Sequence, residues 1–405
     1  MPRTSRVLVL GSGFAGLWTA LGAARRLDEL GAARAAVEII VVSSQPFHDI
    51  RVRNYEADLS ACRIPLRDLL DPVGIAHITA DVTGIDPAQG TVNTADGATL
   101  SYDRLVCALG SRVAKPDLPG LAEFGFDVDT FDGAKRLQGH LRSLADRAAD
   151  PASATVVVVG AGLTGIETAS ELPRMITDAL GSEATPRVIL VDHNPHVGSD
   201  MGASARPVIE DALAANGVDT LTGVGVTAVD ERSVTLSSGE LLAAATVVWC
   251  AGMRANPLTA QLGVECDRLG RLPVDDYLRV KGVDGVFAAG DVAAARVDDE
   301  HMSVMSCQHG RPMGRYAGYN VIGDLLGAPM LSLRIPWYVT VLDLGPAGAV
   351  YTEGWDRQVV STGAEAKATK QVINGERIYP PLTGDRAALL AAAAPEVQSA
   401  PAYGD

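Results

Sequence analysis

The feature that most constrains this sequence is a glycine-rich turn close to the beginning of the chain. A short apolar run ends at Gly11, and Gly13 and Gly16 complete the pattern G-x-G-x-x-G before an Ala- and Leu-rich segment. This pattern is typical of the strand, tight turn and helix start of a βαβ unit that binds a dinucleotide. The first glycine permits the turn, the second lets backbone N–H groups approach a pyrophosphate, and the third lets helix and strand pack closely.

The same pattern occurs again in the middle of the chain. Residues 155–159 are Thr-Val-Val-Val-Val, and Gly160, Gly162 and Gly165 follow with the same spacing. One glycine motif is weak evidence because glycine-rich turns are common. Two such units in one chain make a chance match improbable, and each strengthens the other. We therefore predict an α/β protein with two Rossmann-like dinucleotide-binding domains.

The residue that ends the second strand differs between the two units. An Asp or Glu at this position binds both ribose hydroxyls of the nucleotide. The first unit has Ser43 there, whereas the second has Asp192, and each lies equally far past the last glycine of its motif. A serine offers one neutral hydrogen bond in place of two charge-assisted ones, so we expect a looser hold on the first sugar. Because a carboxylate repels a 2′-phosphate, we expect the second unit to prefer NADH to NADPH.

Length and composition limit the class of protein. With 405 residues the chain exceeds one ordinary domain, and its formal net charge of -15 argues against a nucleic-acid partner and against adhesion to an anionic membrane. No apolar run reaches the roughly 18 residues of a membrane helix, and the N-terminus opens directly into a strand without a secretory signal. The five cysteines are scattered and contain no C-x-x-C pair. These features predict a reduced, cytoplasmic protein without a metal site.

The remaining pattern predicts how the domains follow one another. Residues 116–120 have the composition of a linker, and residues 270–277 return the chain towards the first domain, which is therefore expected to be discontinuous. Strands and a helix near the end predict a small C-terminal α+β domain. The predicted boundaries are 1–114 and 253–330 for the first dinucleotide-binding domain, 115–252 for the second, and 331–405 for the C-terminal domain. Helices are predicted at 17–30, 131–149, 305–326, 364–374 and 386–394, and late strands at 331–344 and 348–361.

The order of these motifs resembles a known class of enzyme. With both glycine motifs, a middle strand at 105–110 and Gly290-Asp291 after a later strand, about the whole chain resembles the pyridine nucleotide:flavin oxidoreductases with two dinucleotide-binding domains. Within this group it is most similar to the type II NADH dehydrogenases (NADH:quinone oxidoreductases). The local motifs that carry this similarity are Gln45-Pro-Phe-His48, Trp249-Cys-Ala-Gly-Met-Arg-Ala-Asn-Pro257, Gln308-His-Gly310 and Ile378-Tyr-Pro-Pro381.

The resemblance implies that the first domain binds FAD and the second binds NADH. Asp291 would bind the ribityl chain of FAD, just before a helix whose N-terminus faces the flavin and stabilises its anionic reduced form. The residues implied to bind one or the other cofactor are Gly11, Gly13, Phe14, Ala15, Gly16, Ser43, Ser44, Arg51, Ala108, Gly110, Gly160, Gly162, Gly165, Asp192, Gly252, Gly290, Asp291 and Gln308.

The resemblance also implies the reaction and its residues. Hydride would pass from NADH to FAD, and two electrons would then pass to a second substrate. Positioning carries most of such a step, so few acid–base residues are needed. Glu167 matches a family glutamate near the nicotinamide, although a carboxylate here can equally serve the helix dipole. Gln308 and His309 are expected near the flavin, and Cys307 is expected to have a packing role.

Two arginines in the segment after the second strand are further candidates. Arg51 and Arg53 are spaced to share one face of an extended segment. There they could neutralise a phosphate or a reduced flavin, or they could simply be solvated.

The sequence departs from the type II enzymes in the residues that concern the acceptor. Quinone-reducing members have two glutamines four residues apart on the helix after Gly290-Asp291. Here Gln308 occupies the second position and Val304 stands at the first. The C-terminal segment also lacks a long amphipathic Leu/Lys pattern, so at most peripheral contact with the inner face of the membrane is expected. The expected partners are NADH and a quinone or other small acceptor, and a homodimer remains open.

Two alternatives remain. One is an NADH oxidase, a peroxidase or an electron-carrier (ferredoxin-type) reductase of the same superfamily, although Cys62 lies too far past the strand end for a peroxidase cysteine. The other is a sensor that binds flavin or NADH without turnover, which a weak hold on FAD at Ser43 would favour. Asp192 and the two intact glycine motifs favour an enzyme.

Overall fold

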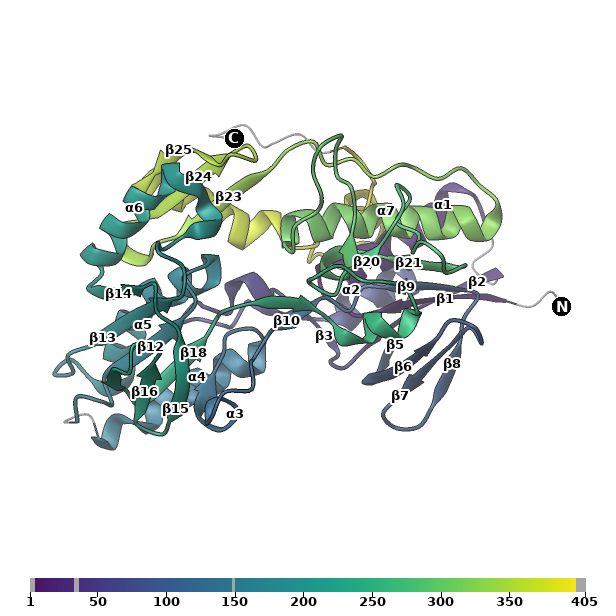
Figure 1. The fold of residues 1–405 in the computed structure, drawn as a ribbon. Helices are drawn as coiled ribbons and strands as arrows, with labels where there is room; N and C mark the ends of the chain where they lie inside the picture. The colour runs from purple at the N-terminus through teal and green to yellow at the C-terminus, as the bar shows by residue number, and fades with distance from the viewer. Residues whose placement is uncertain (1–3, 33–35, 148–149, 398–405) are drawn as a thin grey trace.

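The two largest sheets of the protein repeat one design (Figure 1). The computed structural model describes residues 4–32, 36–147 and 150–397. Each of these sheets has five parallel strands, with the strand that precedes the glycine turn in the middle. The first sheet has the order β21 (Val286–Ala288), β9 (Arg104–Cys107), β1 (Ser5–Leu10), β2 (Val37–Ser43) and β5 (Ala76–Thr79). The second has the order β11 (Gly125–Phe126), β18 (Thr246–Trp249), β12 (Thr155–Val159), β13 (Arg187–Asp192) and β14 (Val218–Thr222).

This arrangement confirms the predicted fold class. Residues 7–10 of β1 and the whole of β12 are continuous runs of apolar and β-branched residues, which suit parallel strands that are covered on both faces. Residues 7–10 of β1 are completely buried. β21 comes from a part of the chain far beyond the second sheet, so the first unit is discontinuous in sequence as predicted.

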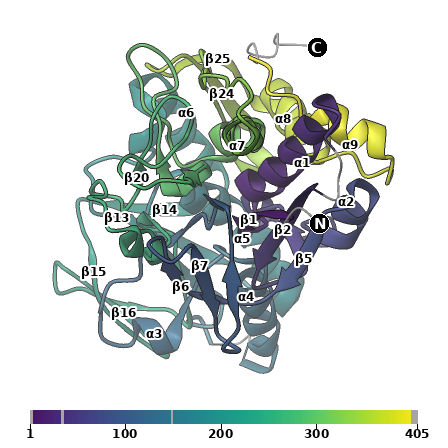
Figure 2. The same ribbon diagram turned by 90° about the vertical axis from the view of Figure 1, so that its right-hand side faces the viewer.

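Helices cover the first sheet on one side, where α1 (Phe14–Glu29) and α7 (Cys307–Leu326) lie side by side (Figure 2). α1 begins three residues earlier than predicted because Gly13 is already its N-cap residue. The two helices approach closely through glycines on α7. A Cβ atom at Gly314 would lie 2.4 Å from the backbone oxygen of Ala15, and one at Gly318 would lie 2.2 Å from that of Thr19.

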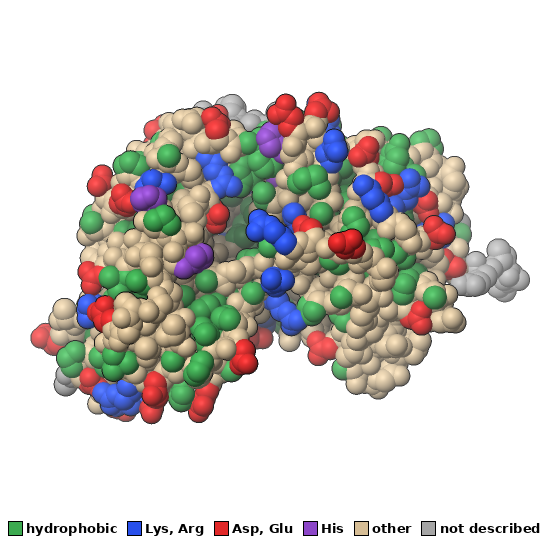
Figure 3. Space-filling model, viewed as in Figure 1, with side chains coloured by type: hydrophobic (Ala, Val, Ile, Leu, Met, Phe, Trp, Pro, Cys, Tyr) green, Lys and Arg blue, Asp and Glu red, His purple; other side chains and the backbone are tan. Residues whose placement is uncertain are grey.

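The two parallel sheets are joined by a pair of short antiparallel strands, β10 (Ser111–Val113) and β19 (Met253–Ala255). In the space-filling view, which has the orientation of Figure 1, Lys and Arg side chains lie near the middle of the molecule, where β10 crosses between the two halves (Figure 3).

Two three-stranded antiparallel sheets are inserted, one in each half of the molecule. They consist of β6 (Val82–Asp86), β7 (Thr91–Thr94) and β8 (Thr99–Ser101), and of β15 (Val226–Asp230), β16 (Ser233–Leu236) and β17 (Leu241–Ala243).

The C-terminal part is α+β as predicted, but the predicted strand at 348–361 is a hairpin of two strands that turns at residues 354–357, so the sheet has three strands. The sheet packs against α5 (Leu163–Leu180) and α6 (Gly202–Ala215) of the second unit. Its elements are β23 (Val339–Asp343), β24 (Ala349–Glu353), β25 (Gln358–Thr362), α8 (Gly363–Val372) and α9 (Arg386–Ala392). The predicted strand at 331–344 was too long, because Pro336 lacks an N–H donor and restricts the residue before it.

Shorter elements complete the connections. α4 (Phe131–Ser143) is shorter than the predicted helix at 131–149, of which residues 148–149 lie outside the described residues. Among the described residues, none of the helices combines the length and apolar character needed to cross a membrane. The other short elements are β3 (Phe47–Asp49), β4 (Arg63–Pro65), α2 (Leu66–Leu70), α3 (Leu121–Phe124), β20 (Leu272–Pro273) and β22 (Ala293–Ala294).

Candidate active site

The first glycine turn has the geometry that its sequence predicts. Gly11 has φ +102°, and a Cβ atom there would lie 2.3 Å from the backbone oxygen of Ala108. A Cβ atom at Gly16 would lie 1.9 Å from the backbone oxygen of Gly11, so the helix can approach the strand only because this residue is a glycine. A Cβ atom at Gly13 would meet no atom within 4 Å. The middle glycine thus faces open space, as a pyrophosphate site requires.

The second turn repeats this geometry. Gly160 has φ +103°, and its added Cβ would lie 2.8 Å from the backbone of Ala251. A Cβ atom at Gly165 would lie 1.7 Å from the backbone oxygen of Gly160. Gly162 is open except for one carboxylate oxygen of Asp200 at 3.4 Å. The two motifs are therefore equivalent in three dimensions as well as in sequence.

The helices that follow the two turns have free N-termini. Neither α1 nor α5 has a side-chain cap or an acidic residue in its first turn. By contrast, α7 is capped by Ser306, whose side chain accepts a hydrogen bond from the backbone N–H of His309. Unpaired N–H groups together with the positive end of the helix dipole favour a bound phosphate. The residues present thus fit the pyrophosphate groups of two dinucleotides.

The two ribose positions differ in structure as they do in sequence. The hydroxyl of Ser43 donates to the backbone oxygen of Gln45 at 2.8 Å and lies 2.9 Å from Nε2 of His77. Ser44 beside it is exposed. The carboxylate of Asp192 accepts hydrogen bonds from the backbone N–H groups of Ala161 (2.5 Å) and Asn194 (2.7 Å). Asp192 is thus fixed against the second glycine turn. The contact between His77 and Ser43 could not be predicted from the sequence, because the two residues lie on different strands.

Asp291 lies where α7, the first sheet and β10 meet. Gly290 before it has φ +75°, and a Cβ atom there would lie 2.6 Å from that of Ala15, close to the first glycine turn. The hydroxyl of Ser111 donates to the Asp291 carboxylate at 2.5 Å. Burial raises the pKa of Asp291, while this hydrogen bond opposes the shift. The structure thus brings the predicted residue Asp291 close to the predicted pyrophosphate site.

Arg51 and Arg53 do not share a face of an extended segment, so this prediction was wrong. They belong to a turn of 3-10 helix, in which their side chains diverge. Arg51 forms an ion pair with Asp129, donates to the backbone oxygen of Ser111 at 3.0 Å, and lies 3.9 Å from Asp291. Arg53 forms an ion pair with Glu56 at 2.6 Å. Arg51 therefore tethers the first unit to the connection between the sheets.

Three further residues that were predicted to bind a cofactor lie just after the strands β9 and β18. Ala108 is buried, and its N–H donates to the backbone oxygen of Leu10. Gly110 (φ +69°) and Gly252 (φ +76°) turn the chain from β9 and β18 into the connecting strands. They therefore determine where β10 and β19 leave the two sheets.

Glu167 forms a buried contact with the C-terminal part of the chain. Its carboxylate accepts a hydrogen bond from Nζ of Lys370 at 2.7 Å and from the backbone N–H of Asp343 at 3.1 Å. Although burial lowers the pKa of Lys370, the carboxylates of Glu167 and Asp343 outweigh this effect and raise it. Glu167 is thus an ionic partner of Lys370 rather than a free dipole-stabilising group. Lys370 was missed because it lies on α8, more than 200 residues away in the sequence.

Gln308 and His309 begin α7 beside the C-terminal sheet. In the amide orientation that satisfies both atoms, the Gln308 side chain donates to the backbone oxygen of Val339 (2.9 Å) and accepts from its N–H (3.2 Å). The Nδ1 atom of His309 accepts a hydrogen bond from the N–H of Val304 at 2.8 Å. The opposite ring nitrogen is buried and has no partner among the described residues. Burial raises the pKa of the neighbouring Cys307 thiol, which suits its predicted packing role.

The buried histidines predict a pH dependence of stability. Burial lowers the pKa of both His48 and His309 to about 4, so both are neutral in the folded protein at pH 5. The unfolded chain binds protons at these residues below about pH 6.5, so stability falls as the pH falls from about 7 towards 4. We expect a loss of about 2 kcal/mol per histidine between pH 7 and 5. Urea unfolding of the His309→Asn variant, which keeps an acceptor for Val304, should show a correspondingly smaller pH dependence; an unchanged pH dependence would contradict the assignment.

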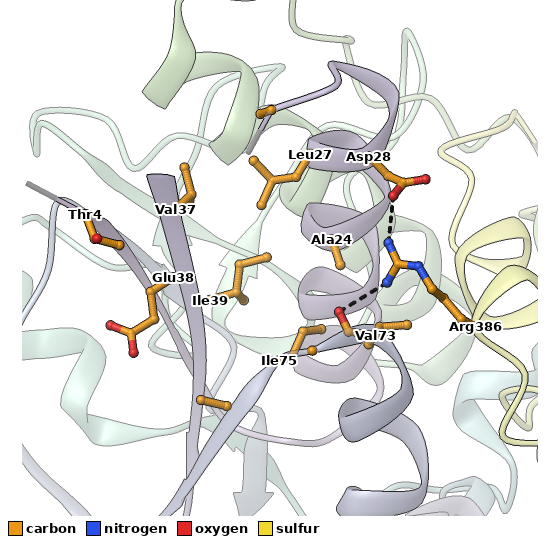
Figure 4. Close-up of a pocket in the computed structure, with 13 residues that line it drawn as sticks. Thr4, Ala24, Leu27, Asp28, Val37, Glu38, Ile39, Val73, Ile75 and Arg386 are labelled. Atoms are coloured by element: carbon orange, nitrogen blue, oxygen red, sulfur yellow. Dashed lines mark hydrogen bonds and ion pairs between the residues drawn. The ribbon is translucent and has the colours of Figure 1, made fainter. Parts of the chain in front are cut away.

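A separate cavity of about 500 Å³ lies at the other end of the first sheet (Figure 4). Val37 and Glu38 at the beginning of β2 line it, whereas the glycine turn is at the carboxyl ends of the strands. Arg386 closes one side by an ion pair with Asp28 at 2.6 Å. This cavity is therefore distinct from the dinucleotide sites, which in this fold lie at the carboxyl edge.

Two equivalent dinucleotide-binding units joined by β10 and β19 define the class of protein, namely the flavin oxidoreductases with two dinucleotide-binding domains. Residues 5–314 match the pyridine nucleotide-disulphide oxidoreductase family, and the chain belongs to this family. The similarity to this class predicted from the sequence motifs is thus confirmed. All five cysteines are free.

Two proteins with similar sequences and one with a similar structure illustrate where the chain lies within this family. Over 98% of its length the chain is 72% identical to an NADH dehydrogenase-like protein of Mycobacterium tuberculosis, all of which is covered. It is 31% identical to the type II NADH:quinone oxidoreductase of the same species, over 81% of this chain and 74% of that protein. The structure of NDH2 from Plasmodium falciparum matches with a TM-score of 0.79, at 14% identity, over 96% of this chain and 97% of that one. This last match concerns the fold alone.

Proposed function

We propose that the protein is a FAD-dependent NADH dehydrogenase that passes two electrons from NADH to a quinone or a similar small acceptor. The observation that carries this proposal is the pair of equivalent glycine turns, each with an open middle glycine and an uncapped helix behind it. One turn suits FAD and the other NADH. The overall reaction converts NADH, a proton and a quinone into NAD+ and a hydroquinone.

The residues of the first unit would hold and orient FAD. Gly13 and the N-terminus of α1 would bind the pyrophosphate, and Asp291 would bind the ribityl chain. When bound, FAD supplies the redox chemistry by accepting hydride from NADH and releasing two electrons to the acceptor. With Ser43 engaged by Gln45 and His77, the adenine ribose would be held without a carboxylate. We assign residues 1–114 and 253–330 to this unit.

The second unit, residues 115–252, would bind NADH through the turn at Gly162 and through Asp192. Glu167 follows this turn by two residues on α5 and is held by Lys370 of the C-terminal part, residues 331–405. This ion pair would fix the NADH unit relative to the C-terminal part. Glu167 therefore acts as a positioning residue in the proposed reaction.

The binding site for the electron acceptor would be formed by the beginning of α7. The side chain of Gln308 is bound to the backbone of Val339, and Val304 contributes its backbone N–H to His309. His309 stays neutral because its pKa is about 4, and its second ring nitrogen is a buried donor without a partner among the described residues. This donor suits an acceptor oxygen. We place the protein in the cytoplasm with at most peripheral membrane contact, and a homodimer is compatible with this function.

The decisive experiment records the visible spectrum of the purified protein and follows the oxidation of NADH and NADPH. We expect a flavin spectrum, bleaching by NADH under anaerobic conditions, and rapid turnover with a soluble quinone. Fast turnover with oxygen alone would instead indicate an oxidase, and turnover with one-electron carriers but no quinone a carrier reductase. Bleaching without turnover on any acceptor would indicate a sensor.

Exchanging Asp192 for the residue of the first unit tests the nucleotide preference. The Asp192→Ser variant should lose about tenfold in kcat/KM for NADH, because two charge-assisted ribose bonds are replaced by one neutral bond. The ratio of NADPH to NADH use should rise because the repulsion of the 2′-phosphate is removed. The Ser43→Ala variant is the matched control and should leave this ratio unchanged. A wild-type preference for NADPH would show that the role assigned to Asp192 is wrong.

A further inference from the structure

A network of polar contacts connects the two dinucleotide-binding units where β10 crosses between them (Figure 1). Asp129 lies between β11 and α4 of the second unit, and its carboxylate forms an ion pair with Arg51 of the first unit. Nη1 of Arg51 donates to the backbone oxygen and to the hydroxyl of Ser111, both at 3.0 Å. The hydroxyl of Ser111 donates in turn to the carboxylate of Asp291 at 2.5 Å. The network therefore runs from the second unit to the residue that would bind the ribityl chain.

Both carboxylate oxygens of Asp129 take part in contacts with other segments. Oδ1 accepts from Arg51, and Oδ2 accepts a hydrogen bond from the backbone N–H of Val113 on β10 at 2.9 Å. The side chain of Asp129 is only 11% exposed. Charge-assisted hydrogen bonds are stronger in such a partly desolvated place than in water. Asp129 thus holds the first unit and the connecting strand at the same time.

The connection between the two units needs such support. β10 and β19 have three residues each and form a two-stranded ribbon, which is only marginally stable by itself. Hydride transfer requires the reacting atoms to lie about 3–3.5 Å apart, and a misplacement of ~1 Å can slow a reaction by a factor on the order of 100. Because NADH and the flavin would be bound by different units, contacts across the boundary have to fix the orientation of these units.

The network also leaves Asp291 prepared for a ligand. Arg51 lies 3.9 Å from Oδ2 of Asp291, but it is paired with Asp129 instead. Oδ1 of Asp291 has no hydrogen-bond partner in the part of the chain that the structure describes, and the side chain is 20% exposed. Burial raises the pKa of Asp291, whereas the hydrogen bond from Ser111 and the charge of Arg51 oppose this shift. The contacts that orient Asp291 therefore also favour its ionised form, which accepts hydrogen bonds from hydroxyl groups.

We propose that Asp129 is a positioning residue for hydride transfer, because through Arg51 and Ser111 it fixes the second unit relative to Asp291. The nicotinamide of NADH would thereby be placed against a flavin whose ribityl chain is held by Asp291. This inference rests on the proposed function. In the step that Asp129 serves, a hydride passes from NADH to FAD, which leaves NAD+ and the anionic reduced flavin. Asp129 itself touches neither cofactor and acts through Arg51.

A second ion pair across the same boundary offers a matched control. Asp132 on α4, three residues after Asp129, pairs with Arg63 of the first unit at 3.4 Å, but its side chain is 67% exposed. Arg63 is also held by Asp49 at 2.7 Å and lies over the ring of Phe131 at 4.0 Å. Because an exposed pair contributes little and Arg63 keeps its other contacts, loss of the Asp132 charge should not change how the units are oriented.

Anaerobic stopped-flow bleaching of the FAD-loaded protein by NADH separates positioning from binding. For Asp129→Asn we expect the limiting rate at saturating NADH to fall about tenfold, because the nicotinamide is less well placed. The Kd for NADH and the FAD content should stay within about twofold of the wild type. Asp129→Glu keeps the charge and should recover part of the limiting rate. Asp132→Asn should bleach like the wild type.

A double-mutant cycle tests whether Asp129 acts through Arg51. Arg51→Met should also lower the limiting rate, and adding Asp129→Asn should slow it no further, since both changes break the same contact. A limiting rate of Asp129→Asn within about twofold of the wild type overturns the proposal, as do fully additive effects of the two changes.

A further variant decides the question if Asp129→Asn does not fold. Ser111→Ala breaks the network without removing a charge and should lower the limiting rate about threefold, because the bond that orients Asp291 is lost. An unchanged limiting rate of Ser111→Ala would then overturn the proposal. Failure of the proposed function would appear differently, as a wild-type flavin that NADH does not bleach.

Discussion

Replacing Gly16 by alanine is expected to destabilise the protein by more than about 4 kcal/mol and to leave it without flavin. A Cβ atom at this position would lie 1.9 Å from the backbone oxygen of Gly11, in the turn that joins β1 to α1. The backbone cannot move aside, because the N–H of Gly11 is bonded to the backbone oxygen of Val42. The change should be visible as a loss of yellow colour and as a lower urea midpoint.

Gly13→Ala is the matched control for this prediction. The added methyl group meets no atom within 4 Å, and the backbone of Gly13 has φ -68°, which alanine adopts without strain. The variant should therefore be folded with a stability close to that of the wild type. It should nevertheless bind FAD more weakly, because the methyl group occupies the space through which a pyrophosphate approaches the helix N-terminus. Full retention of FAD by both variants would exclude the first turn as the flavin site.

Removing the buried counter-charge of Glu167 is expected to have the second largest effect. The Lys370→Met variant leaves the Glu167 carboxylate buried with only the N–H of Asp343 as a donor, which should cost about 3–5 kcal/mol. The pKa of Glu167 should rise, because burial already raises it and the ammonium group that opposed this shift is gone. Urea unfolding at pH 7 measures the loss. The same variant should slow flavin bleaching by NADH, because the NADH unit is no longer fixed to the C-terminal part.

The double variant Glu167→Gln/Lys370→Met provides the test of this explanation. With both charges removed, stability should return to within about 2 kcal/mol of the wild type, since a neutral pair of similar volume replaces the ion pair. Lys367→Met is the control, because Lys367 pairs with Asp343 at a partly exposed position and should cost about 1 kcal/mol or less. If the single and double variants are equally unstable, the ion pair does not account for the loss.

The local motifs were sufficient to predict both dinucleotide-binding units. Each glycine in them has one backbone role, and that role depends on residues only a few positions away or on the adjacent strand. The equivalence of Ser43 and Asp192 could likewise be read from spacing, because each ends the second strand of its unit and lies equally far past the last glycine of its motif. The discontinuity of the first unit was predicted because residues 270–277 return the chain towards the first domain, and the strand that follows them, β21, lies at the edge of the first sheet.

Contacts between distant segments could not be predicted. Arg51 and Arg53 were expected to share one face, but a turn of 3-10 helix directs Arg51 towards Asp129 and Arg53 towards Glu56. His77 meets Ser43 only because their strands are neighbours in the first sheet.

The sequence by itself determined the class of fold, the two glycine turns and the difference between the two ribose positions. These depend on short-range steric requirements, such as a positive φ at Gly11 or a close backbone approach at Gly16, that very few residues satisfy. Only the tertiary structure decided which charges are paired. Lys370 reaches Glu167 and Arg51 reaches Asp129, because burial and long-range packing determine which side chains lose water and which partners remain within reach.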